Sequence, residues 1–330
     1  MGSWFLRRWY LSGYSAWYLR PLAALFGLVA SARRRRQQQK AALERLPVPV
    51  IVVGNIAVGG TGKTPCVIWL AEQLKKWGWR PGIISRGYGG RSGSWPRRVT
   101  SFSDPADVGD EAVLIARATG CPVTVGPDRM VDARSLLANE NVDILISDDG
   151  LQHYRLPRDL EIVVVDASRG LGNGHLLPAG PLREPPSRLR EVGLVVVNGR
   201  GWKAPVERSL TMELVPGQAQ SLKGVERRAL AGFSGNTVHA VAGIGNPARF
   251  FSMLSRHGIQ LVMHPFPDHH PFRASDLEFG DELPVLMTEK DAVKCAKFAS
   301  ERHWVVPVTA QVDAAGYALV QELTDALRKK

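Results

Sequence analysis

A glycine-rich segment between two apolar stretches constrains the fold of this chain more than any other feature. It reads AVGGTGKT over residues 57–64 and follows Val48–Val53, an apolar run that predicts a buried strand. The stretch Thr64–Trp77 after it predicts a helix. A glycine-rich turn from a strand into a helix is typical of a phosphate-binding loop, because its backbone N–H groups converge on an anion at the helix N-terminus. The order of these parts predicts an α/β fold that binds a nucleotide.

The loop supplies six candidate nucleotide-binding residues, which are Gly59, Gly60, Thr61, Gly62, Lys63 and Thr64. The Lys63 ammonium group can reach the β and γ phosphates, and the Thr64 hydroxyl can ligate Mg²⁺. Loops of this kind usually begin with a glycine five residues before Gly62, but this chain has Ala57 there. A glycine-rich turn with a purely structural role is the alternative interpretation.

Short apolar runs alternate with helical stretches along the rest of the chain. This alternation predicts an α/β protein with a P-loop NTPase-like, doubly wound parallel sheet and a second, smaller α/β domain. Further strands of the first sheet are expected at Gly82–Ser85, Pro122–Val125, Val142–Ser147, Glu161–Val165 and Gly193–Val197, with helices at Glu111–Ala118 and Arg129–Asn139. In the second unit, strands are expected at Val238–Ala242, Ile259–Met263, Pro284–Met287 and Trp304–Val308, and helices at Pro247–His257, Asp291–Phe298 and from Ala315. The predicted organisation is an N-terminal segment over residues 1–40, a P-loop domain over 41–205, a linker over 206–232 and a C-terminal α/β domain over 233–330.

The N-terminal segment is basic and aromatic. The first 46 residues carry +8 of the formal net charge of +11, with basic residues that include Arg7, Arg8 and Arg33–Arg36. The first 26 residues hold eight of the 25 aromatic residues, namely Trp4, Phe5, Trp9, Tyr10, Tyr14, Trp17, Tyr18 and Phe26. Aromatic side chains favour the membrane interface and a basic block favours anionic head groups, so we predict a helix that lies on a membrane surface or partly enters it. A signal peptide ending at Ala30-Ser31-Ala32 and an ordinary helix docked on its own domain are the alternatives.

The composition of the rest of the chain limits the kinds of partner that the protein is expected to bind. The remaining residues are close to neutral, which excludes the basic surface that wraps nucleic acid. The three cysteines, Cys66, Cys121 and Cys295, are widely spaced, which fits a reducing compartment and matches neither a disulfide framework nor a zinc motif. No obligate protein partner is evident.

Two adjacent carboxylates, Asp148 and Asp149, follow the predicted strand Val142–Ser147. Ligands of open α/β sheets bind at the carboxyl ends of the strands. One carboxylate can hold Mg²⁺ as the acidic partner of a phosphate loop, while the other, or His153, faces the substrate. A helix cap or a turn is the alternative explanation for the acidic pair.

Three further segments carry candidate residues. A flexible loop contains Arg86, Tyr88 and Arg91 and suits an anionic substrate, although solvated charges on a turn would look the same. Asp110 opens a predicted helix, where an N-cap is the first interpretation and a general base the second. The Gly/Pro-rich loop Gly170–Glu184 is too long for a plain connector and is therefore predicted to be functional.

Histidines and a lysine mark the second domain. Asp268-His269-His270, with His264 nearby, fits a metal cluster, an acid/base site or a solvated loop, and its spacing matches no standard zinc pattern. The segment Thr288–Asp291 is similar to a guanine-reading motif, but its lysine stands one place too late, so guanine recognition is not predicted.

Taken in order, these segments resemble the tetraacyldisaccharide 4′-kinase (lipid A 4′-kinase) family of Gram-negative bacteria. The resemblance runs from about residue 3 to residue 294 and rests on GN at 54–55, VGGTGKTP at 58–65, SRGYG at 85–89, GDE at 109–111, DDGLQH at 148–153, LREP at 182–185, FPDHH at 266–270 and TEKD at 288–291. Each motif alone is modest, whereas the ordered set is specific. The family does not keep a glycine at the position of Ala57.

The resemblance implies an ATP- and Mg²⁺-dependent lipid kinase with two α/β/α domains joined by a short β linker. Its substrate would be the lipid A disaccharide precursor, tetraacyldisaccharide 1-phosphate, phosphorylated on the 4′-hydroxyl to give lipid IVA at the cytoplasmic face of the bacterial inner membrane. The family implies that Asp110 and His269 form the base, against the N-cap interpretation of Asp110, and that Lys63 and Asp149 complete the catalytic set. Mg²⁺ would be held by Thr64, Asp148 and Glu184, and the substrate by Arg86, Tyr88, Arg91, His153 and Arg183.

A different class of protein competes with this prediction. A P-loop NTPase switch or metallochaperone at the membrane would use its histidines to deliver a metal, but the chain offers no C-x-x-C or His-rich delivery site. A membrane-tethered nucleotide sensor that is not an enzyme would keep Lys63 and Thr64 but would have no use for Asp110, His269 and Glu184 together.

Overall fold

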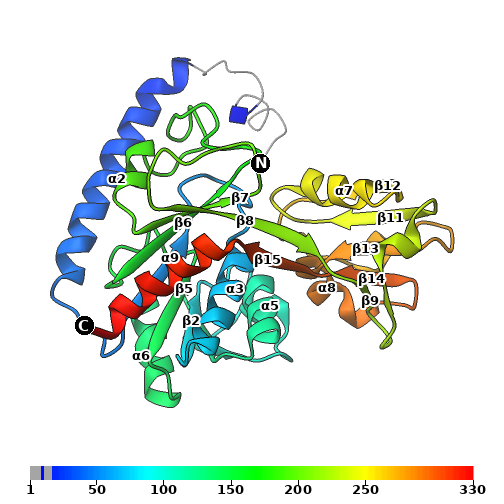
Figure 1. Cartoon of the computed structure of the whole chain (residues 1–330), viewed down its shortest axis with the longest axis horizontal. Coiled ribbons are helices and arrows are strands. Elements are labelled where there is room, and N and C mark those ends of the chain that lie inside the picture. Colours follow the sequence, from blue (N-terminus) through cyan, green and yellow to red (C-terminus); the bar gives the residue numbers. More distant parts are fainter. Residues whose placement is uncertain (1–8, 11–16, 330) are drawn as a thin grey trace.

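The structure is a computed structural model that describes residues 9–10 and 17–329. Two β-sheets with helices on their faces dominate it, and they lie side by side along the long axis of the molecule (Figure 1). Trp4, Phe5, Arg7, Arg8 and Tyr14 lie outside the described residues. The predicted fold class, a P-loop NTPase-like α/β protein with a second, smaller α/β domain, is confirmed.

The first sheet has nine strands in the order β15-β8-β7-β6-β1-β5-β2-β4-β3. Neighbours from β4 to β8 are parallel, and only the edge strands β3 and β15 are antiparallel. The inner strands are short and almost wholly buried, as expected for a sheet covered on both faces. The bounds are β1 Val50–Gly54, β2 Pro81–Ser85, β3 Arg97–Val99, β4 Val123–Val125, β5 Ile144–Asp148, β6 Leu160–Asp166, β7 Leu194–Asn198, β8 Ser209–Pro216 and β15 Val308–Val312.

Helices cover both faces of this sheet and make two hydrophobic cores. Buried side chains of α3 (Lys63–Lys76), α5 (Asp110–Thr119) and α9 (Ala314–Asp325) pack on one face. The helix α6 (Arg129–Asn139) packs on the other face with the loops that follow β5 and β7. Two short helical segments, α4 (Pro105–Val108) and the 3₁₀ turn η2 (Pro186–Arg190), complete this domain.

The strand order places the predicted catalytic and binding residues at one edge of the first sheet. β1 lies between β5 and β6, so the phosphate loop after β1 adjoins the Asp148-Asp149 pair after β5. β2, which precedes Arg86, is the next strand beyond β5. Because these strands are parallel, all their carboxyl ends meet at the same edge of the sheet.

The second sheet has six strands in the order β10-β9-β14-β13-β11-β12, and β14, β13, β11 and β12 are parallel. The helices α7 (Pro247–Arg256) and α8 (Glu289–Cys295) each pack over a separate core of this sheet. The strands are β9 Ala219–Ser221, β10 Arg227–Arg228, β11 Thr237–Ala242, β12 Gln260–Pro265, β13 Val285–Thr288 and β14 His303–Val306, with 3₁₀ turns η3 Leu230–Phe233, η4 Ala274–Leu277 and η5 Ala296–Phe298. The 3₁₀ turn η6 Ala326–Lys329 follows α9 and belongs to the first domain.

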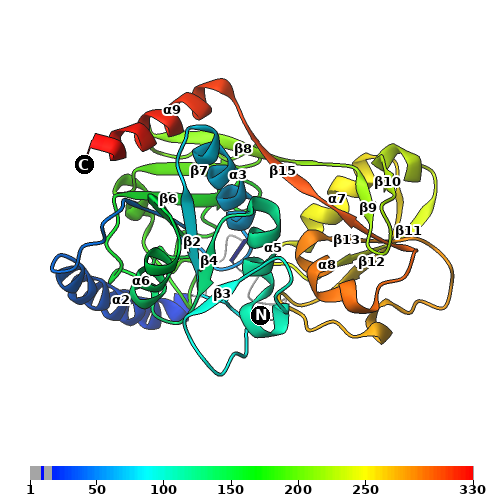
Figure 2. The same ribbon diagram turned by 90° about the horizontal axis from the view of Figure 1, so that it is seen from below.

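The connection between the sheets differs from the predicted linker over 206–232 and domain over 233–330. β8 joins the first sheet, and the chain returns to that sheet through β15 and α9. The predicted strand Trp304–Val308 is two strands separated by Pro307, because proline lacks the N–H that a continuous ladder needs. β8 and β15 pair in antiparallel fashion, as do β9 and β14, so two antiparallel strands join the domains (Figure 2).

The N-terminal segment contains a short 3₁₀ turn, η1 (Trp17–Leu19), and the long helix α2 (Arg20–Ala41). This helix runs along one side of the first domain (Figure 1), where Arg34 forms an ion pair with Glu191. Much of its apolar surface faces outward, with Leu22, Leu25, Leu28 and Val29 between 53% and 70% exposed. No helix in the described ranges combines the length and apolar character of a membrane-spanning segment.

Candidate active site

The phosphate loop has the backbone geometry that its glycines predict. Gly59 has φ = 114° and Gly62 has φ = 92°, conformations that a side chain would strain. Gly62 directly precedes α3, so the loop opens onto the N-terminus of this helix. Two asparagines brace the loop: Asn55 donates to the Gly59 carbonyl at 3.3 Å, and Asn198 donates to the Thr61 carbonyl at 2.9 Å. Hydrogen bonds from Asn55, which directly follows β1, and from Asn198, the last residue of β7, therefore fix the loop in a conformation that can bind an anion.

Lys63 lies against the acidic pair. Its Nζ is 3.4 Å from Oδ1 of Asp149, and Arg183 approaches the same oxygen at 3.9 Å. Burial alone would raise the pKa of Asp149, but the charges of Lys63 and Arg183 hold this pKa below its ordinary value. Asp149 has φ = 47°, an uncommon conformation for a residue with a side chain, and such strain concentrates at functional sites.

Asp148 is fully buried at the end of β5. Its Oδ2 accepts a hydrogen bond from Ser85 at 3.0 Å, while its Oδ1 has no hydrogen-bond partner in the described part of the chain. Burial raises the pKa of Asp148 to about 7, and the charges of Glu111 and Asp149 add to this effect. A buried carboxylate oxygen without a donor is suited to a cation.

Glu184 ends the Gly170–Glu184 loop in a buried polar network. Its Oε1 accepts from Gln152 at 2.7 Å, while Tyr154 donates to Oε2 and Arg188 donates to Oε2 at 3.2 Å. Oε1 keeps a free lone pair for a further ligand. Glu184 therefore also accepts hydrogen bonds that link this buried network, a structural role that the sequence prediction did not include.

The Asp110–His269 pair joins the two domains. Nδ1 of His269 lies 3.1 Å from Oδ1 and 3.2 Å from Oδ2 of Asp110. Burial favours a higher pKa for Asp110, but the hydrogen bond with His269 and the charges of Lys290 and Lys294 hold the pKa of Asp110 below its ordinary value. The pKa of His269 is raised: burial opposes its protonation, and the hydrogen bond with Asp110 outweighs burial.

His269 shares an uncommon backbone conformation, a positive φ angle, with Asp149. It has φ = 61°, and these two are the only residues other than glycine with positive φ in the described ranges. Both were predicted to be catalytic from the sequence. Asp110 does not act as an N-cap, because Gly109 occupies that position and Asp110 is the first residue of α5.

The predicted substrate-binding residues do not form one cluster. The ring of Tyr88 lies 4.6 Å from that of His269, centroid to centroid, and Arg183 lies beside Asp149. Burial and the charges of Arg129 and Arg86 lower the pKa of His153 to about 4, so His153 is neutral at physiological pH. The side chain of Arg91 is exposed.

The second domain is in direct contact with the phosphate loop. A Cβ added to Gly245 would lie 2.2 Å from the backbone nitrogen of Gly60, so the two backbones touch. Asn246 donates to Asp166 at 2.9 Å, and Arg249 donates to Oδ1 of Asn198 at 2.6 Å. Nucleotide binding and domain arrangement are thus mechanically connected through the loop after β11.

Sequence reasoning missed several residues that the structure brings to this site. Asn198 ends a buried strand at the ligand-binding edge, and that position alone could have identified it. Arg129 is 1% exposed, and its Nη1 donates to the Gly126 carbonyl at 2.6 Å. Its Nε and Nη2 have no hydrogen-bond partner among the described residues, and its charge reaches Asp148 and Asp149. No sequence pattern marks Arg129, because a long-range fold places it there.

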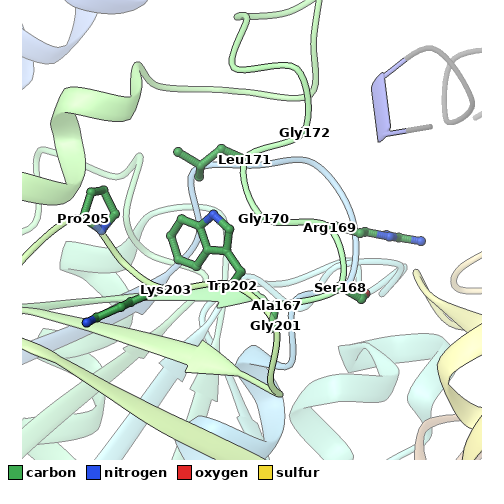
Figure 3. A pocket seen from close by; sticks show the side chains of 10 residues that line it. All are labelled: Ala167, Ser168, Arg169, Gly170, Leu171, Gly172, Gly201, Trp202, Lys203 and Pro205. Atoms are coloured by element: carbon green, nitrogen blue, oxygen red, sulfur yellow. The ribbon is translucent and has the colours of Figure 1, made fainter. Parts of the chain in front are cut away.

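A pocket lies next to the phosphate loop on the side of β6 and β7 (Figure 3). Trp202 packs against Gly170, where an added Cβ would lie 2.8 Å from the indole. Arg169 lines the pocket and approaches Gly59, whose added Cβ would lie 3.1 Å from the guanidinium. The pocket contains none of the predicted site residues; its lining is Ala167, Ser168, Arg169, Gly170, Leu171, Gly172, Gly201, Trp202, Lys203 and Pro205.

The arrangement defines a class of protein. The end of β2 and the loop after it join the two groups: Ser85 donates to Asp148, and the ring of Tyr88 lies against that of His269, so the acid–imidazole pair and the phosphate-loop carboxylates share one site. A nucleotide switch needs the loop and its acidic partner but no acid–imidazole pair beside them, whereas transfer to an acceptor hydroxyl needs both. The site is that of a P-loop phosphotransferase.

Comparison with known proteins identifies the family. The family model described as tetraacyldisaccharide-1-P 4′-kinase (LpxK) matches residues 15–328, so the chain belongs to the tetraacyldisaccharide 4′-kinase family. A tetraacyldisaccharide 4′-kinase of Alkalilimnicola ehrlichii is 59% identical over 298 residues, which cover 90% of this chain and 89% of that protein. The corresponding protein of Nitrosococcus oceani is 51% identical over 98% of this chain and 95% of its own length.

A solved structure agrees with this membership. The crystal structure of LpxK from Aquifex aeolicus in complex with ATP superposes with a TM-score of 0.75 at 28% sequence identity. The match covers 93% of this chain and 98% of the Aquifex chain. The resemblance inferred from the ordered motifs is confirmed.

Proposed function

We propose that this chain carries out the family reaction, transfer of the γ-phosphate of ATP to the 4′-hydroxyl of tetraacyldisaccharide 1-phosphate, with the residues described above in defined roles. The observation that carries the assignment is the shared site, in which the end of β2 and the loop after it join the Asp148-Asp149 pair to the Asp110–His269 pair through Ser85 and Tyr88. Binding of ATP by the Aquifex relative supports ATP as the donor.

Lys63 and the amide groups of Gly59–Thr64 bind the phosphates of ATP. The loop is backed by Asn55 and Asn198, so the amides need little reorganisation when a phosphate arrives. Asp149 forms an ion pair with Lys63. A bound γ-phosphate would compete with Asp149 for Lys63, which frees Asp149 for the transferred group or its metal.

Mg²⁺ fits the donor set on the described residues. The buried Oδ1 of Asp148 has no hydrogen-bond donor, and the Thr64 hydroxyl stands at the start of α3. Glu184 can add its free Oε1 lone pair. Mg²⁺ would supply charge neutralisation on the phosphates during transfer, and a cation beside Asp148 would displace the proton that its raised pKa favours.

Asp110 is the proposed acceptor of the proton from the 4′-hydroxyl. His269 orients Asp110 through Nδ1. A carboxylate held ionised by its neighbours is a weak base, so its contribution comes from position and from sharing the proton with His269.

Recognition of the lipid is assigned to Arg86, Tyr88, Arg91, His153 and Arg183. The exposed ring of Tyr88 covers His269 and can pack on a sugar face, while the arginines suit an anionic substrate. The exposed leucines of α2, next to Arg33–Arg36, would place this edge of the protein on the cytoplasmic face of the inner membrane.

Mass spectrometry of products tests the proposal. The wild-type protein, incubated with Mg·ATP and tetraacyldisaccharide 1-phosphate, should add one phosphate at the 4′ position, and Lys63→Ala should not. Asp149→Asn and Asp110→Asn should both lose transfer, with Asp110→Asn retaining nucleotide binding. Nucleotide hydrolysis by the wild type without a phosphorylated lipid would instead favour the NTPase switch.

A further inference from the structure

The segment Thr288–Asp291, which resembles a guanine-reading motif without matching it, lies at the Asp110–His269 pair. Thr288 caps α8, and its Oγ1 donates to Asp291 at 2.6 Å. Asp291 also accepts from the Gly243 backbone at 2.9 Å and is fully buried. This fixes the first turn of α8, and the same helix face then carries Lys290 and Lys294, four residues apart.

Lys290 contacts three partners from two domains. Its Nζ lies 3.0 Å from Oε1 of Glu111 on α5, 2.9 Å from Oδ1 of Asp268 and 3.2 Å from Nε2 of His269. An ammonium group only donates hydrogen bonds, so Nε2 of His269 must accept here and Nδ1–H must face Asp110. Lys290 therefore selects the tautomer in which His269 donates to Asp110.

Lys294 approaches the other member of the pair. Its Nζ lies 3.5 Å from Oδ2 of Asp110 and 2.9 Å from Oδ1 of Asp291, and it sits over the ring of Phe272. The side chain is 11% exposed, so its charge is weakly screened. Lys294 thus favours the ionised form of Asp110.

We propose that Lys290 and Lys294 are positioning residues that keep Asp110 ionised and Nε2 of His269 unprotonated, and that Lys290 ties this pair together across the domain interface. The catalytic meaning of this inference rests on the proposed function of Asp110 and His269. Tyr88, from the loop after β2, completes the groups that face the pair.

Charge balance gives the direction of the effect. Four carboxylates, from Asp110, Glu111, Asp268 and Asp291, meet two ammonium groups at this interface. The charge of Lys290 lowers the proton affinity of both His269 and Asp110. Removal of either lysine leaves an excess of negative charge, so the pair should hold its proton to higher pH.

The variants Lys290→Met and Lys294→Met test the proposal by kinetics. We expect kcat to fall about tenfold or more, with the KM for ATP changed by less than about twofold, because the phosphate loop is untouched. The acidic limb of the pH profile of kcat/KM should move up by about one pH unit. Lys290→Arg, which keeps the charge, should return this limb close to its wild-type position, and Lys297→Met, an exposed lysine one turn further on, should behave as wild type.

A lower kcat with an unmoved acidic limb, or unchanged kcat in both variants, would overturn the proposal. NMR with labelled histidine provides a readout that does not need turnover, with the His269 signals assigned by their loss in His269→Gln. At a pH above the raised pKa of His269 we expect the Nδ1–H tautomer in the wild type, and at a given lower pH we expect a larger protonated fraction in Lys290→Met. If the wild type forms no phosphorylated lipid, the proposed function fails; if it does and the His269 titration is the same in both proteins, the lysine inference alone fails.

Discussion

The side-chain amide of Asn198 donates a hydrogen bond of 2.9 Å to the carbonyl of Thr61, inside the phosphate loop. The amide oxygen of Asn198 accepts from Arg249 of the second domain. The buried residue at the end of β7 is therefore hydrogen-bonded both to the phosphate loop and to the second domain.

We expect Asn198→Ala to weaken ATP binding, because the Thr61 carbonyl loses its donor and the loop loses its support. The loss of a buried hydrogen-bond partner costs about 1–3 kcal/mol, which corresponds to roughly fivefold to a hundredfold in Kd. Isothermal titration calorimetry with Mg·ATP measures the change. Arg200→Ala, at an 84% exposed side chain two residues further along, is the control and should bind ATP as the wild type does.

The contact between Gly245 and Gly60 predicts a steric block. In Gly245→Ala the new methyl group would stand 2.2 Å from the Gly60 nitrogen, so the second domain must move away from the phosphate loop. Misplacement on this scale can lower turnover by about a hundredfold. Steady-state kinetics and small-angle scattering should show a slower enzyme with separated domains, whereas Gly93→Ala, which meets nothing within 4 Å, should change neither.

Arg188 provides a stability test. Its side chain is 1% exposed and contacts both Glu161 and Glu184. Arg188→Met removes one of the two cations that pair with Glu161 and leaves Glu184 with no ion-pair partner among the described residues, and loss of a buried partner typically costs about 3–5 kcal/mol. Urea unfolding of the variant should report a loss of this size, and a loss below about 1 kcal/mol would show that water reaches the network.

The same network predicts a pH dependence. Burial favours a higher pKa for Glu161, but the hydrogen bond and charge of Arg188 and the charge of Arg158 hold this pKa below its ordinary value. A carboxylate with a lowered folded-state pKa adds stability that is present above its unfolded pKa, about 4.3, and is lost as the pH falls through the folded value. The free energy of unfolding of the wild type should therefore exceed that of Glu161→Gln most at neutral pH, and the difference should shrink in urea titrations at about pH 3.

The outward face of α2 predicts membrane binding. Leu25 and Leu28 are 57% and 70% exposed, and burial of each in a bilayer interface is worth about 1.5–3 kcal/mol. Leu25→Asp with Leu28→Asp should weaken flotation with anionic vesicles by at least about tenfold. Val225→Asp, at a 99% exposed apolar residue of the second domain, is the control, and equal binding of both variants would contradict the proposed surface.

Local pattern was sufficient to predict the elements of the P-loop domain. Val48–Val53 and Val142–Ser147 are apolar runs between turn signals, and the structure has strands β1 and β5 there within two residues. The phosphate loop and the acidic pair were found because each lies at the end of such a strand. Asp148 and Lys63 are thus readable from sequence alone.

Pairing between distant segments could not be predicted from the local sequence. The five residues of β15 carry no local sign that they return to β8 instead of continuing the second sheet. Asp110 and His269 are 159 positions apart, and residue types alone favoured a helix cap and a solvated loop. Their association was expected only from the family resemblance, and Arg129 and Lys290 needed the fold itself.

The double crossing between the sheets has a consequence for synthesis of the protein. The edge strand β15 and the helix α9, which cover part of the nucleotide-binding half, are encoded after the whole second sheet. A ribosome that has made residues 1–232 has therefore produced a phosphate loop without the layer that closes its own core. The nucleotide-binding half can finish folding only after β15 and α9 have left the exit tunnel, so the two halves mature together and not in sequence.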